Sequence, residues 1–367
     1  MLFKNTCGKS FLSVLLLSLP FVLISTKAAA ANGQPFQQLQ DQINAQQDQI
    51  NAQQEQINQL LLNPSSAPIE VTVNCPGGSI NDTLAEYAGI DAPLIVTING
   101  KCDEVVSIQR NNVTLRGATS TDGLALTTTP LGAISATAGL SGITIENMTL
   151  DLIGGWGIAC VNNTMAINNV VINNAIVGII AAVGGRCTVN GSTIDGTGTG
   201  IGSGVIVGDQ AVMAMYSSTI RNTGLGVHVH SNGDAYLGNF TGPGPSVIEN
   251  TSTGILVTNG SNVSLGSIEI RNNATGVEVF PNSALGINNA LSPGAYTSIH
   301  NNTTGLVFHQ NTSYTHIAGN LVTQVQNNTG YGIVCEPNVT FSAISAGLPV
   351  LSGNNGGGAQ HDNCPLP

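Results

Sequence analysis

The residues best suited to chemistry in this chain are two histidines and three carboxylates. His228 and His230 are separated by one residue, so both imidazoles project from the same face of a β-strand, where they could bind a metal ion. Paired with Glu278, they would instead supply a general base and a general acid. Asp151 and Asp195 form a second candidate pair, of the kind that glycosidases use. We treat all five as candidate catalytic residues and expect no metal or other cofactor; histidines that are simply solvated on a strand are the alternative.

A repeat positions these side chains. A phrase of glycine, an apolar residue, any residue and a small or apolar residue occurs eight times, from Gly157-Ile158-Ala159-Cys160 to Gly332-Ile333-Val334-Cys335, at intervals of 21 to 29 residues with a mean of 25. A repeat of this length indicates a solenoid in which each unit buries its apolar face against its neighbours. Strand-like units punctuated by Gly and Asn favour a parallel β-helix, for which we expect about eleven turns over residues 71–367.

The period predicts an outward row of polar residues just ahead of each glycine phrase. In order, the row reads Asp151, Asn173, Asp195, Arg221, Glu249, Arg271, His300 and Gln326. Its middle alternates in charge at single-layer spacing, which favours a structural role for most of the row. Asp151 and Asp195 would lie two layers or about 9.6 Å apart, at the edge of the spacing of inverting glycosidases. The asparagines that follow are interpreted as a structural ladder: Asn174, Asn222, Asn250, Asn272, Asn301 and Asn327.

The outward positions of the glycine phrase form the best candidate site. His228 and His230 are followed on successive layers by Leu256 and Thr258, Glu278 and Phe280, Val307 and His309, and Val334 and Glu336. Glu278 would lie two layers above the histidines, roughly 10 Å away, which is far for a third metal ligand. Asp234, on the following turn, is a second possibility.

The first residues resemble an export signal. Residues 1–31 combine Lys4 and Lys9, an apolar core from Phe11 to Ile24 and the small residues Ala28–Ala31. Removing them leaves six basic and 20 acidic residues, a formal charge of −14. That balance argues against a nucleic-acid partner and against cleavage of acidic polysaccharides. We therefore expect a secreted, periplasmic or cell-surface chain with no membrane span after cleavage.

Cysteine spacing agrees with an oxidising compartment. Six cysteines follow the signal, in sequence pairs 27, 27 and 29 residues apart. One period of a solenoid returns the chain to the same place about 4.8 Å away, within the Cα separation of a disulfide. We predict three disulfides, with free buried thiols as the alternative: Cys75–Cys102, Cys160–Cys187 and Cys335–Cys364.

Two helical segments are expected before the repeats. Residues 37–62 carry heptads with Ile43, Ile50 and Ile57 at one seam position, and Leu39, Gln46, Gln53 and Leu60 at the other. This pattern predicts a coiled-coil stalk and a homo-oligomer, with a trimer favoured over a Gln-rich flexible tract. Residues 63–70 would be a linker. Residues 79–88 predict an amphipathic helix that covers the open first layer of the solenoid.

The first turns resemble the pectin-lyase-like superfamily of right-handed parallel β-helix proteins. The residues that carry this resemblance are Ile95-Val96-Thr97-Ile98-Asn99-Gly100-Lys101-Cys102, Val113-Thr114-Leu115-Arg116-Gly117 and the glycine phrases. The resemblance covers about 71–364 and implies an all-β, right-handed parallel β-helix solenoid. It does not imply one function, because the superfamily includes lyases, hydrolases, epimerases, phage tailspikes and noncatalytic surface proteins.

The enzyme signatures of that superfamily are missing. The chain has no adjacent Asp-Asp, no Gly-His-Gly and no Arg-x-Lys as in polygalacturonases, and no Asp-Pro-His-Asp as in mannuronan epimerases. We therefore expect a noncatalytic protein that interacts with glycans or surfaces, with Trp156, Tyr216, Tyr296 and Tyr314 as aromatic contacts. The alternatives are a polysaccharide lyase or glycosidase that uses the His228, His230 and Glu278 face, and an architectural element without a ligand.

Overall fold

The computed structural model describes residues 43–53, 67–128, 131–196, 202–238, 245–288, 296–317, 323–344, 349–355 and 361–364. The chain divides into two units, Met1–Pro64 and Ser65–Pro367. In the first unit, residues 43–53 form an α-helix in which Ile43 and Ile50 are 50% and 55% exposed. The predicted signal and the remainder of the predicted stalk lie outside the described residues. No helix among those described is long and apolar enough to span a membrane.

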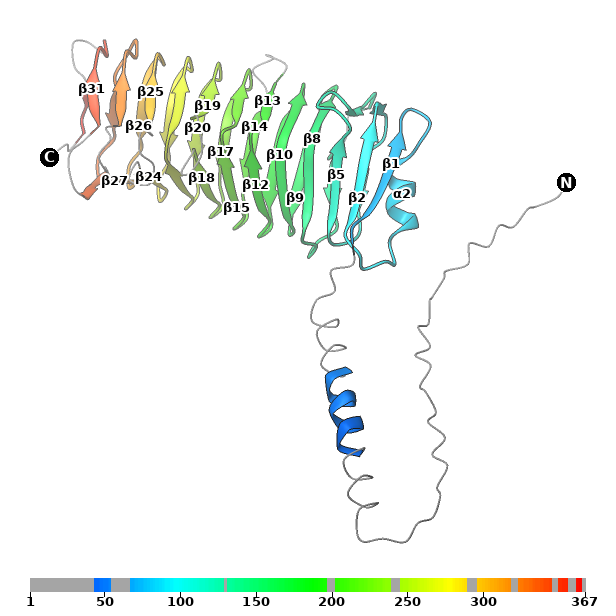
Figure 1. Ribbon diagram of the computed structural model, residues 1–367. Helices are drawn as coiled ribbons and strands as arrows, with labels where there is room; N and C mark the ends of the chain where they lie inside the picture. Colours follow the sequence, from blue (N-terminus) through cyan, green and yellow to red (C-terminus); the bar gives the residue numbers. More distant parts are fainter. Residues whose placement is uncertain are drawn as a thin grey trace, which may run out of the picture. The chain divides into compact units, whose positions relative to one another are not determined.

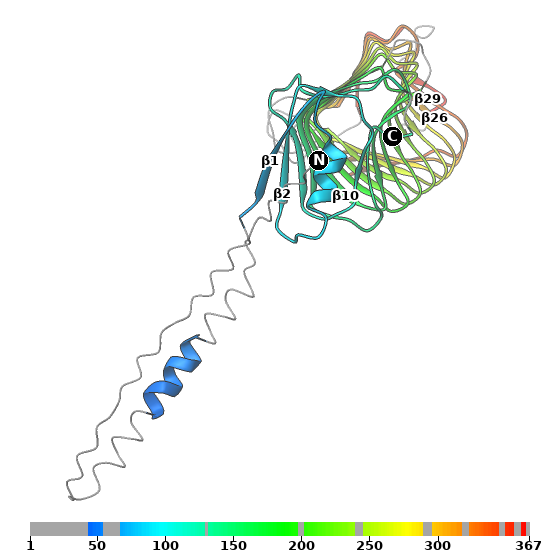
Figure 2. The same ribbon diagram turned by 90° about the vertical axis from the view of Figure 1, so that its right-hand side faces the viewer.

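The second unit is a parallel β-solenoid with three columns of strands, which confirms the all-β fold class (Figure 1). Every strand pair in it is parallel, and each coil contributes one strand or half-strand to each column. Viewed toward its N-terminal end, successive coils superpose (Figure 2). The described strands belong to eleven coils, after a lone first strand that begins at Ile69 rather than at Val71.

The first and second columns are joined into one 21-stranded sheet because the long strands β8 and β10 run through both. The first column contains β1 (Ile69–Asn74), β2 (Leu94–Asn99), β5 (Val113–Gly117), β8 (Ile143–Asp151), β10 (Thr164–Asn173), β12 (Arg186–Asn190), β15 (Val212–Tyr216), β18 (Asp234–Leu237), β21 (Asn262–Leu265), β24 (Ala284–Asn288), β27 (Ser313–Ile317) and β30 (Thr340–Ile344). The second contains β3 (Lys101–Cys102), β6 (Gly123–Ala125), the ends of β8 and β10, β13 (Thr193–Asp195), β16 (Thr219–Arg221), β19 (Ser246–Glu249), β22 (Ile268–Arg271), β25 (Ser298–His300), β28 (Gln324–Gln326) and β31 (Val350–Ser352).

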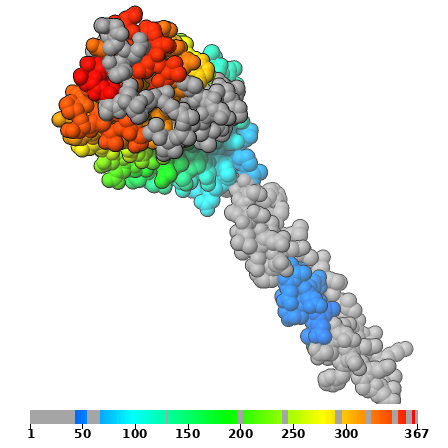
Figure 3. Space-filling model, turned by 90° about the vertical axis from the view of Figure 1, so that its left-hand side faces the viewer, coloured from blue at the N-terminus to red at the C-terminus, as the bar shows by residue number. Residues whose placement is uncertain are grey.

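The third column is an 11-stranded sheet and carries the glycine phrase. It contains β4 (Val106–Ile108), β7 (Ile134–Ala136), β9 (Trp156–Val161), β11 (Val177–Ala182), β14 (Ser203–Val207), β17 (Leu225–Val229), β20 (Thr253–Val257), β23 (Thr275–Val279), β26 (Thr304–Phe308), β29 (Ile333–Cys335) and β32 (His361–Asp362). We call the outer surfaces of the three columns the first, second and third faces. Figure 3 views the solenoid from the end where β31 lies.

The core lies inside the three columns, because side chains alternate inward and outward along every strand. In the second column, aliphatic side chains repeat in register from coil to coil and are fully or almost fully buried: Ile172, Ile194, Ile220, Ile248, Ile270, Ile299 and Val325. Each such side chain packs on its equals above and below, so a single unit has no core of its own.

A short helix, α2 (Ile80–Glu86), lies at the N-terminal end of the stack next to β1 and β2 (Figures 1 and 2). The Ser79 hydroxyl accepts a hydrogen bond from the Asp82 amide at 3.1 Å, as expected of an N-cap. Ile80 and Leu84 are buried in the core. The Glu104 carboxylate also accepts from the Ile80 amide at 2.5 Å, which ties the helix to the next coil.

All three predicted disulfides are present. Cys75–Cys102, Cys160–Cys187 and Cys335–Cys364 join neighbouring coils with Cα separations of 5.1, 6.2 and 4.9 Å. The one-period argument is therefore confirmed. Two of the bridges lie in the first and last coils, where a strand has a neighbour on one side only.

The asparagine ladder differs from the predicted one by a single residue. Asn174, Asn222, Asn250, Asn272, Asn301 and Asn327 do occupy the left-handed region, with φ from 54° to 61°, so they form the turn between the second and third columns. The stacked, buried asparagine side chains belong to the residues that follow Asn272, Asn301, Asn327 and Gly353, namely Asn273, Asn302, Asn328 and Asn354. A turn residue at positive φ directs the next side chain inward, and the sequence pattern alone did not separate the two positions.

The glycine phrase is explained by close packing at the same corner. A Cβ on Gly305 would lie 2.4 Å from the carbonyl oxygen of Gly332 and 2.7 Å from Val325 Cγ1. Gly276 is equally crowded by Gly305 and Ile299. Glycine therefore recurs where the third column passes close to the aliphatic row of the second column, because a larger residue would not fit there.

Candidate functional site

The third face carries the predicted histidines on β17 and the turn after it. Their rings are 4.9 Å apart, centroid to centroid. His228 Nε2 lies 3.4 Å from the Thr258 hydroxyl, and His230 Nδ1 lies 2.9 Å from the Ser231 hydroxyl. Burial and the neighbouring His230 lower the pKa of His228 below its ordinary value. Both imidazoles therefore contact hydroxyl groups rather than a carboxylate.

Glu278 is not brought to these histidines. His228 pairs in register with Leu256 on the next coil, and Leu256 pairs with Glu278 on the coil after that. The apolar Leu256 therefore lies between His228 and Glu278. The partner of Glu278 is His309, whose Nε2 lies 3.0 Å from Glu278 Oε1. His309 Nδ1 lies 2.9 Å from Glu336 Oε1.

The resulting Glu–His–Glu cluster spans three successive coils, at the ends of β23, β26 and β29. The Phe280 ring packs against the His309 imidazole, with centroids 4.2 Å apart and the two planes tilted by 34°. Partial burial opposes protonation of His309, but the hydrogen bonds that its imidazole donates to the Glu278 and Glu336 carboxylates outweigh burial and raise the pKa of His309. The hydrogen bond from His309 and that from the Gln310 amide lower the pKa of Glu336. Both imidazole nitrogens of His309 are therefore occupied by carboxylate oxygens.

Sequence reasoning placed His309 and Glu336 on this face but did not single them out. The contact is diagonal: Glu278 occupies the first outward position of its strand, and His309 the second outward position of the next coil. Diagonal neighbours lie within reach of long side chains. A search for opposite charges along straight rows misses such a pair.

The carboxylates Asp151 and Asp195 are held apart and paired with cations. Asn173 lies between them in the second-column register. Asp151 lies 2.8 Å from Lys101 Nζ and accepts from the Asn173 amide at 2.8 Å. Burial would raise the pKa of Asp151, but the contacts with Lys101 and Asn173 dominate and lower it. Asp195 is bound to Arg221 Nε at 2.8 Å. Each of the two carboxylates therefore contacts a cation, and the two are not brought together.

A hollow of about 230 Å³ lies on the first face, over β18, β21, β24 and β27. The Tyr236 ring, with the side chain 47% exposed, stands at its edge. In register, Tyr236 is followed by Ser264, Gly286 and Thr315 on successive coils. Asp234 Oδ1 accepts a hydrogen bond from the Asn262 amide at 2.9 Å along the same wall. The hollow exists because the outward row changes from an aromatic residue to small ones.

Gly286 is not required by the fold. Its φ lies outside the left-handed region, and a Cβ there would meet its nearest atoms, Val263 O and Ser264 Oγ, at 3.8 and 3.9 Å. Those are ordinary van der Waals contacts, in contrast with the crowded corner glycines. A glycine inside a strand weakens it, and one without a steric cause is typical of a place where a ligand approaches.

Sequence analysis did not predict this hollow, although the residue pattern that produces it can be recognised in the sequence. In Ala235-Tyr236-Leu237 and Leu285-Gly286-Ile287, alternation puts the middle residue outward. Of the predicted aromatic contacts, Tyr296 is 41% exposed, and Trp156 and Tyr216 are partly exposed. Tyr314 was predicted wrongly: it is 1% exposed, and burial raises the pKa of its hydroxyl. It lies in register with the inward Leu285 and packs against Phe308.

No cluster of three or more His, Cys, Asp or Glu side chains is placed to hold a metal ion anywhere in the described ranges. No protein-family model matches the chain, and no curated protein matches its sequence. Among solved structures, the A-module of the Azotobacter vinelandii mannuronan C-5 epimerase AlgE4 is similar, with 11% identity and a TM-score of 0.43 over 78% of this chain and 92% of that one. An identity and a TM-score this low do not bear on the function of this chain.

Proposed function

We propose that this is a secreted, noncatalytic β-solenoid protein that binds a neutral glycan in the hollow on the first face. The observation that carries the proposal is Gly286, a strand glycine without a steric cause that keeps the surface beside Tyr236 open. A pyranose ring laid on Tyr236 would cover the small residues. Its hydroxyls would meet Asp234, Asn262 and Thr315, a mix of donors and acceptors that suits sugars.

The charges of the hollow favour a neutral ligand. Its lining contains one carboxylate, Asp234, and no Lys or Arg. A polyuronate would bring several carboxylates to a surface that already carries a negative charge and lacks a counterion, which is unfavourable.

Binding is favoured over turnover because each candidate carboxylate is already held by a partner. Asp151 and Asp195 are fixed by cations, and the Glu278 and Glu336 carboxylates both contact His309. A general acid needs a free proton aimed at the substrate, and a general base needs an accessible lone pair. The three disulfides are typical of an oxidising compartment and support secretion. The exposed Ile43 and Ile50 support the homo-oligomeric stalk.

The test is calorimetric titration of the mature protein with neutral gluco-, manno- and xylo-hexasaccharides, with hexagalacturonate as the charged comparison. For the neutral ligand that binds, we expect Tyr236→Ala to weaken affinity at least about ten-fold, since a stacking platform is lost. Gly286→Thr should abolish binding in the hollow while the melting temperature stays equal or rises, because Thr is favoured in strands.

Ala214→Thr is the matched control. Ala214 occupies the same outward row as Gly286, next to Tyr236 on its N-terminal side and outside the hollow. Unchanged binding in Gly286→Thr would refute the proposed site. The enzymatic alternative predicts new reducing ends or unsaturated uronides from a polysaccharide panel, and their loss in Glu278→Gln.

A further inference from the structure

A second concave surface lies on the second face, over β22, β25 and β28. It is a groove of about 470 Å³ whose lining comes from three successive coils and from the residue that leads into β25: Glu269, Arg271, Tyr296, Ser298, His300, Gln324 and Gln326. None of these residues belongs to the hollow that contains Tyr236, and the groove lies on a different column of strands.

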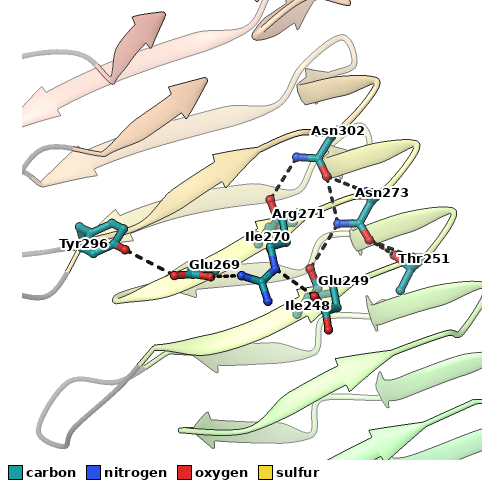
Figure 4. A network of polar contacts seen from close by, with 9 residues as sticks. All are labelled: Ile248, Glu249, Thr251, Glu269, Ile270, Arg271, Asn273, Tyr296 and Asn302. Atoms are coloured by element: carbon teal, nitrogen blue, oxygen red, sulfur yellow. Dashed lines mark hydrogen bonds and ion pairs between the residues drawn. The ribbon is translucent and has the colours of Figure 1, made fainter. Parts of the chain in front are cut away.

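One wall of the groove is a fixed ionic network (Figure 4). Arg271 Nη1 lies 2.7 Å from Glu269 Oε2, and Arg271 Nε lies 2.9 Å from Glu249 Oε2. The Tyr296 hydroxyl donates to Glu269 Oε1 at 3.4 Å. Tyr296 is therefore held by its hydroxyl while 41% of the side chain stays exposed. An aromatic ring held in this way is a ready platform for stacking.

The depth of the groove comes from Ser298. It lies in register between Glu269 and Gln324, one coil from each, and is 2% exposed. A short side chain between two long ones makes Ser298 the floor of the groove, below the level of the Glu269 and Gln324 side chains. The opposite wall is made by Gln324 and Gln326, whose side-chain amides are joined by a 3.1 Å hydrogen bond. The distance between the walls is two coils, about 9.6 Å, which admits a single sugar ring.

The charges of the groove determine what it can accept. Arg271 is countered by two carboxylates, so the guanidinium does not attract an anion strongly. The remaining groups are amides, hydroxyls and His300, which donate and accept hydrogen bonds without a fixed positive charge. This combination of a ring platform, one wall whose charges are paired and one wall of side-chain amides matches a hydroxyl-rich, uncharged ligand.

We infer that the groove lined by Tyr296, Ser298 and Gln324 is a second saccharide site, independent of the hollow on the first face. The ligand class rests on the proposed function, but the location does not. Since the two sites lie on different faces, one chain would hold two neutral glycans at once. The protein would then bridge glycan chains as well as attach to one.

The test uses the stoichiometry of the same calorimetric titration, on the full mature protein with the neutral hexasaccharide that binds. We expect two ligands per wild-type chain. Tyr296→Ala and Ser298→Gln should each reduce this to one, because the first removes the platform and the second fills the groove. Tyr296→Phe keeps the ring and should change the affinity of this site less than about three-fold. The affinity should change less than about two-fold between low and high salt.

Two variants keep the result interpretable. Thr219→Gln is the control for Ser298→Gln. Thr219 occupies the same outward row, two coils before Glu269, and lies outside the groove, so this variant should still bind two ligands. Tyr236→Ala should leave one ligand, bound in the groove. One ligand in wild type that disappears with Tyr236→Ala and not with Tyr296→Ala would overturn this inference alone. One ligand that disappears only with Tyr296→Ala would uphold it and overturn the first-face site. No binding of any hexasaccharide would overturn both.

Discussion

The inside and the outside of the same coils follow different rules. At the inner corner between the second and third columns, one residue type recurs on four successive coils, and the side-chain amides form a continuous chain. Asn273 donates to Asn302 at 3.1 Å, Asn302 to Asn328 at 3.2 Å, and Asn328 to Asn354 at 2.8 Å. On the outer faces of those coils and of the coil before them, residue type changes at nearly every step, as from Tyr236 to Ser264 to Gly286.

The difference separates structure from function. A buried amide must satisfy both its donor and its acceptor, and stacking identical residues does so on every coil. An outward position has no such requirement, because water satisfies it. A change of residue type on an outer face, such as an exposed tyrosine beside a glycine that packing does not require, therefore has a cause other than folding. Repetition inside specifies the solenoid, and irregularity outside is where we propose that a ligand binds.

The largest effect on stability is expected from removing one asparagine of the buried ladder. Asn302→Ala deletes the acceptor of the Asn273 amide N–H and the donor to the Ile270 carbonyl, and leaves a cavity in the core. We expect a loss of about 3–5 kcal/mol in the free energy of unfolding, measured by denaturant titration. Asn301→Gly is the control: Asn301 is exposed with φ 55°, a conformation that glycine adopts easily, so stability should hardly change. Equal effects at the two positions would contradict the assignment of the buried ladder.

The same distinction explains which features of the molecule could be predicted from the sequence. The period, the columns, the alternation and the disulfides come from repetition, so they could be predicted. The outward second-column row from Asp151 to Gln326 is likewise in the predicted register. The ladder was misassigned by one residue because both Asn301 and its neighbour Asn302 recur, and only the backbone dihedral angles show which side chain turns inward.

A smaller effect distinguishes the two kinds of glycine. Gly305→Ala would place a Cβ 2.4 Å from the Gly332 carbonyl oxygen, so the corner must open, at a cost of about 1–3 kcal/mol. Gly286→Ala should be neutral or stabilising by about 0.5 kcal/mol, because the added methyl has room and the unfolded chain loses freedom. Thermal unfolding of the two variants against the wild type measures both. A destabilised Gly286→Ala would remove the argument that this glycine is kept for a ligand.

The candidate site was harder to predict than the fold because its contacts cross rows and coils. Glu278 lies two coils from His228, as the period predicts, but its partner is His309, on the next coil and at the next outward position. The hollow depends on the absence of a side chain at Gly286. A glycine in a strand has the same letter whether packing or ligand access requires it, so sequence alone does not distinguish the two causes.

The smallest predicted effect concerns two histidines on the third face, whose pKa values move in opposite directions. The pKa of His309 is raised, so its contribution to stability is complete below the ordinary histidine value of about 6.5 and is lost as pH rises through the folded-state pKa. The pKa of His228 is lowered, so its contribution is present above about 6.5 and is lost as pH falls through the folded-state pKa. In an NMR titration of the mature protein, the imidazole signals of the two residues should have midpoints on opposite sides of that ordinary value.

Glu336→Gln separates the causes of these shifts. It removes the carboxylate that contacts His309 Nδ1, so the midpoint of His309 should fall while that of His228 stays in place. An unchanged His309 midpoint would show that Glu336 is not its partner in solution. An outer face can therefore hold two residues of one type in opposite electrostatic environments a few coils apart, which the inner corner, where each rung has the same neighbours, does not allow.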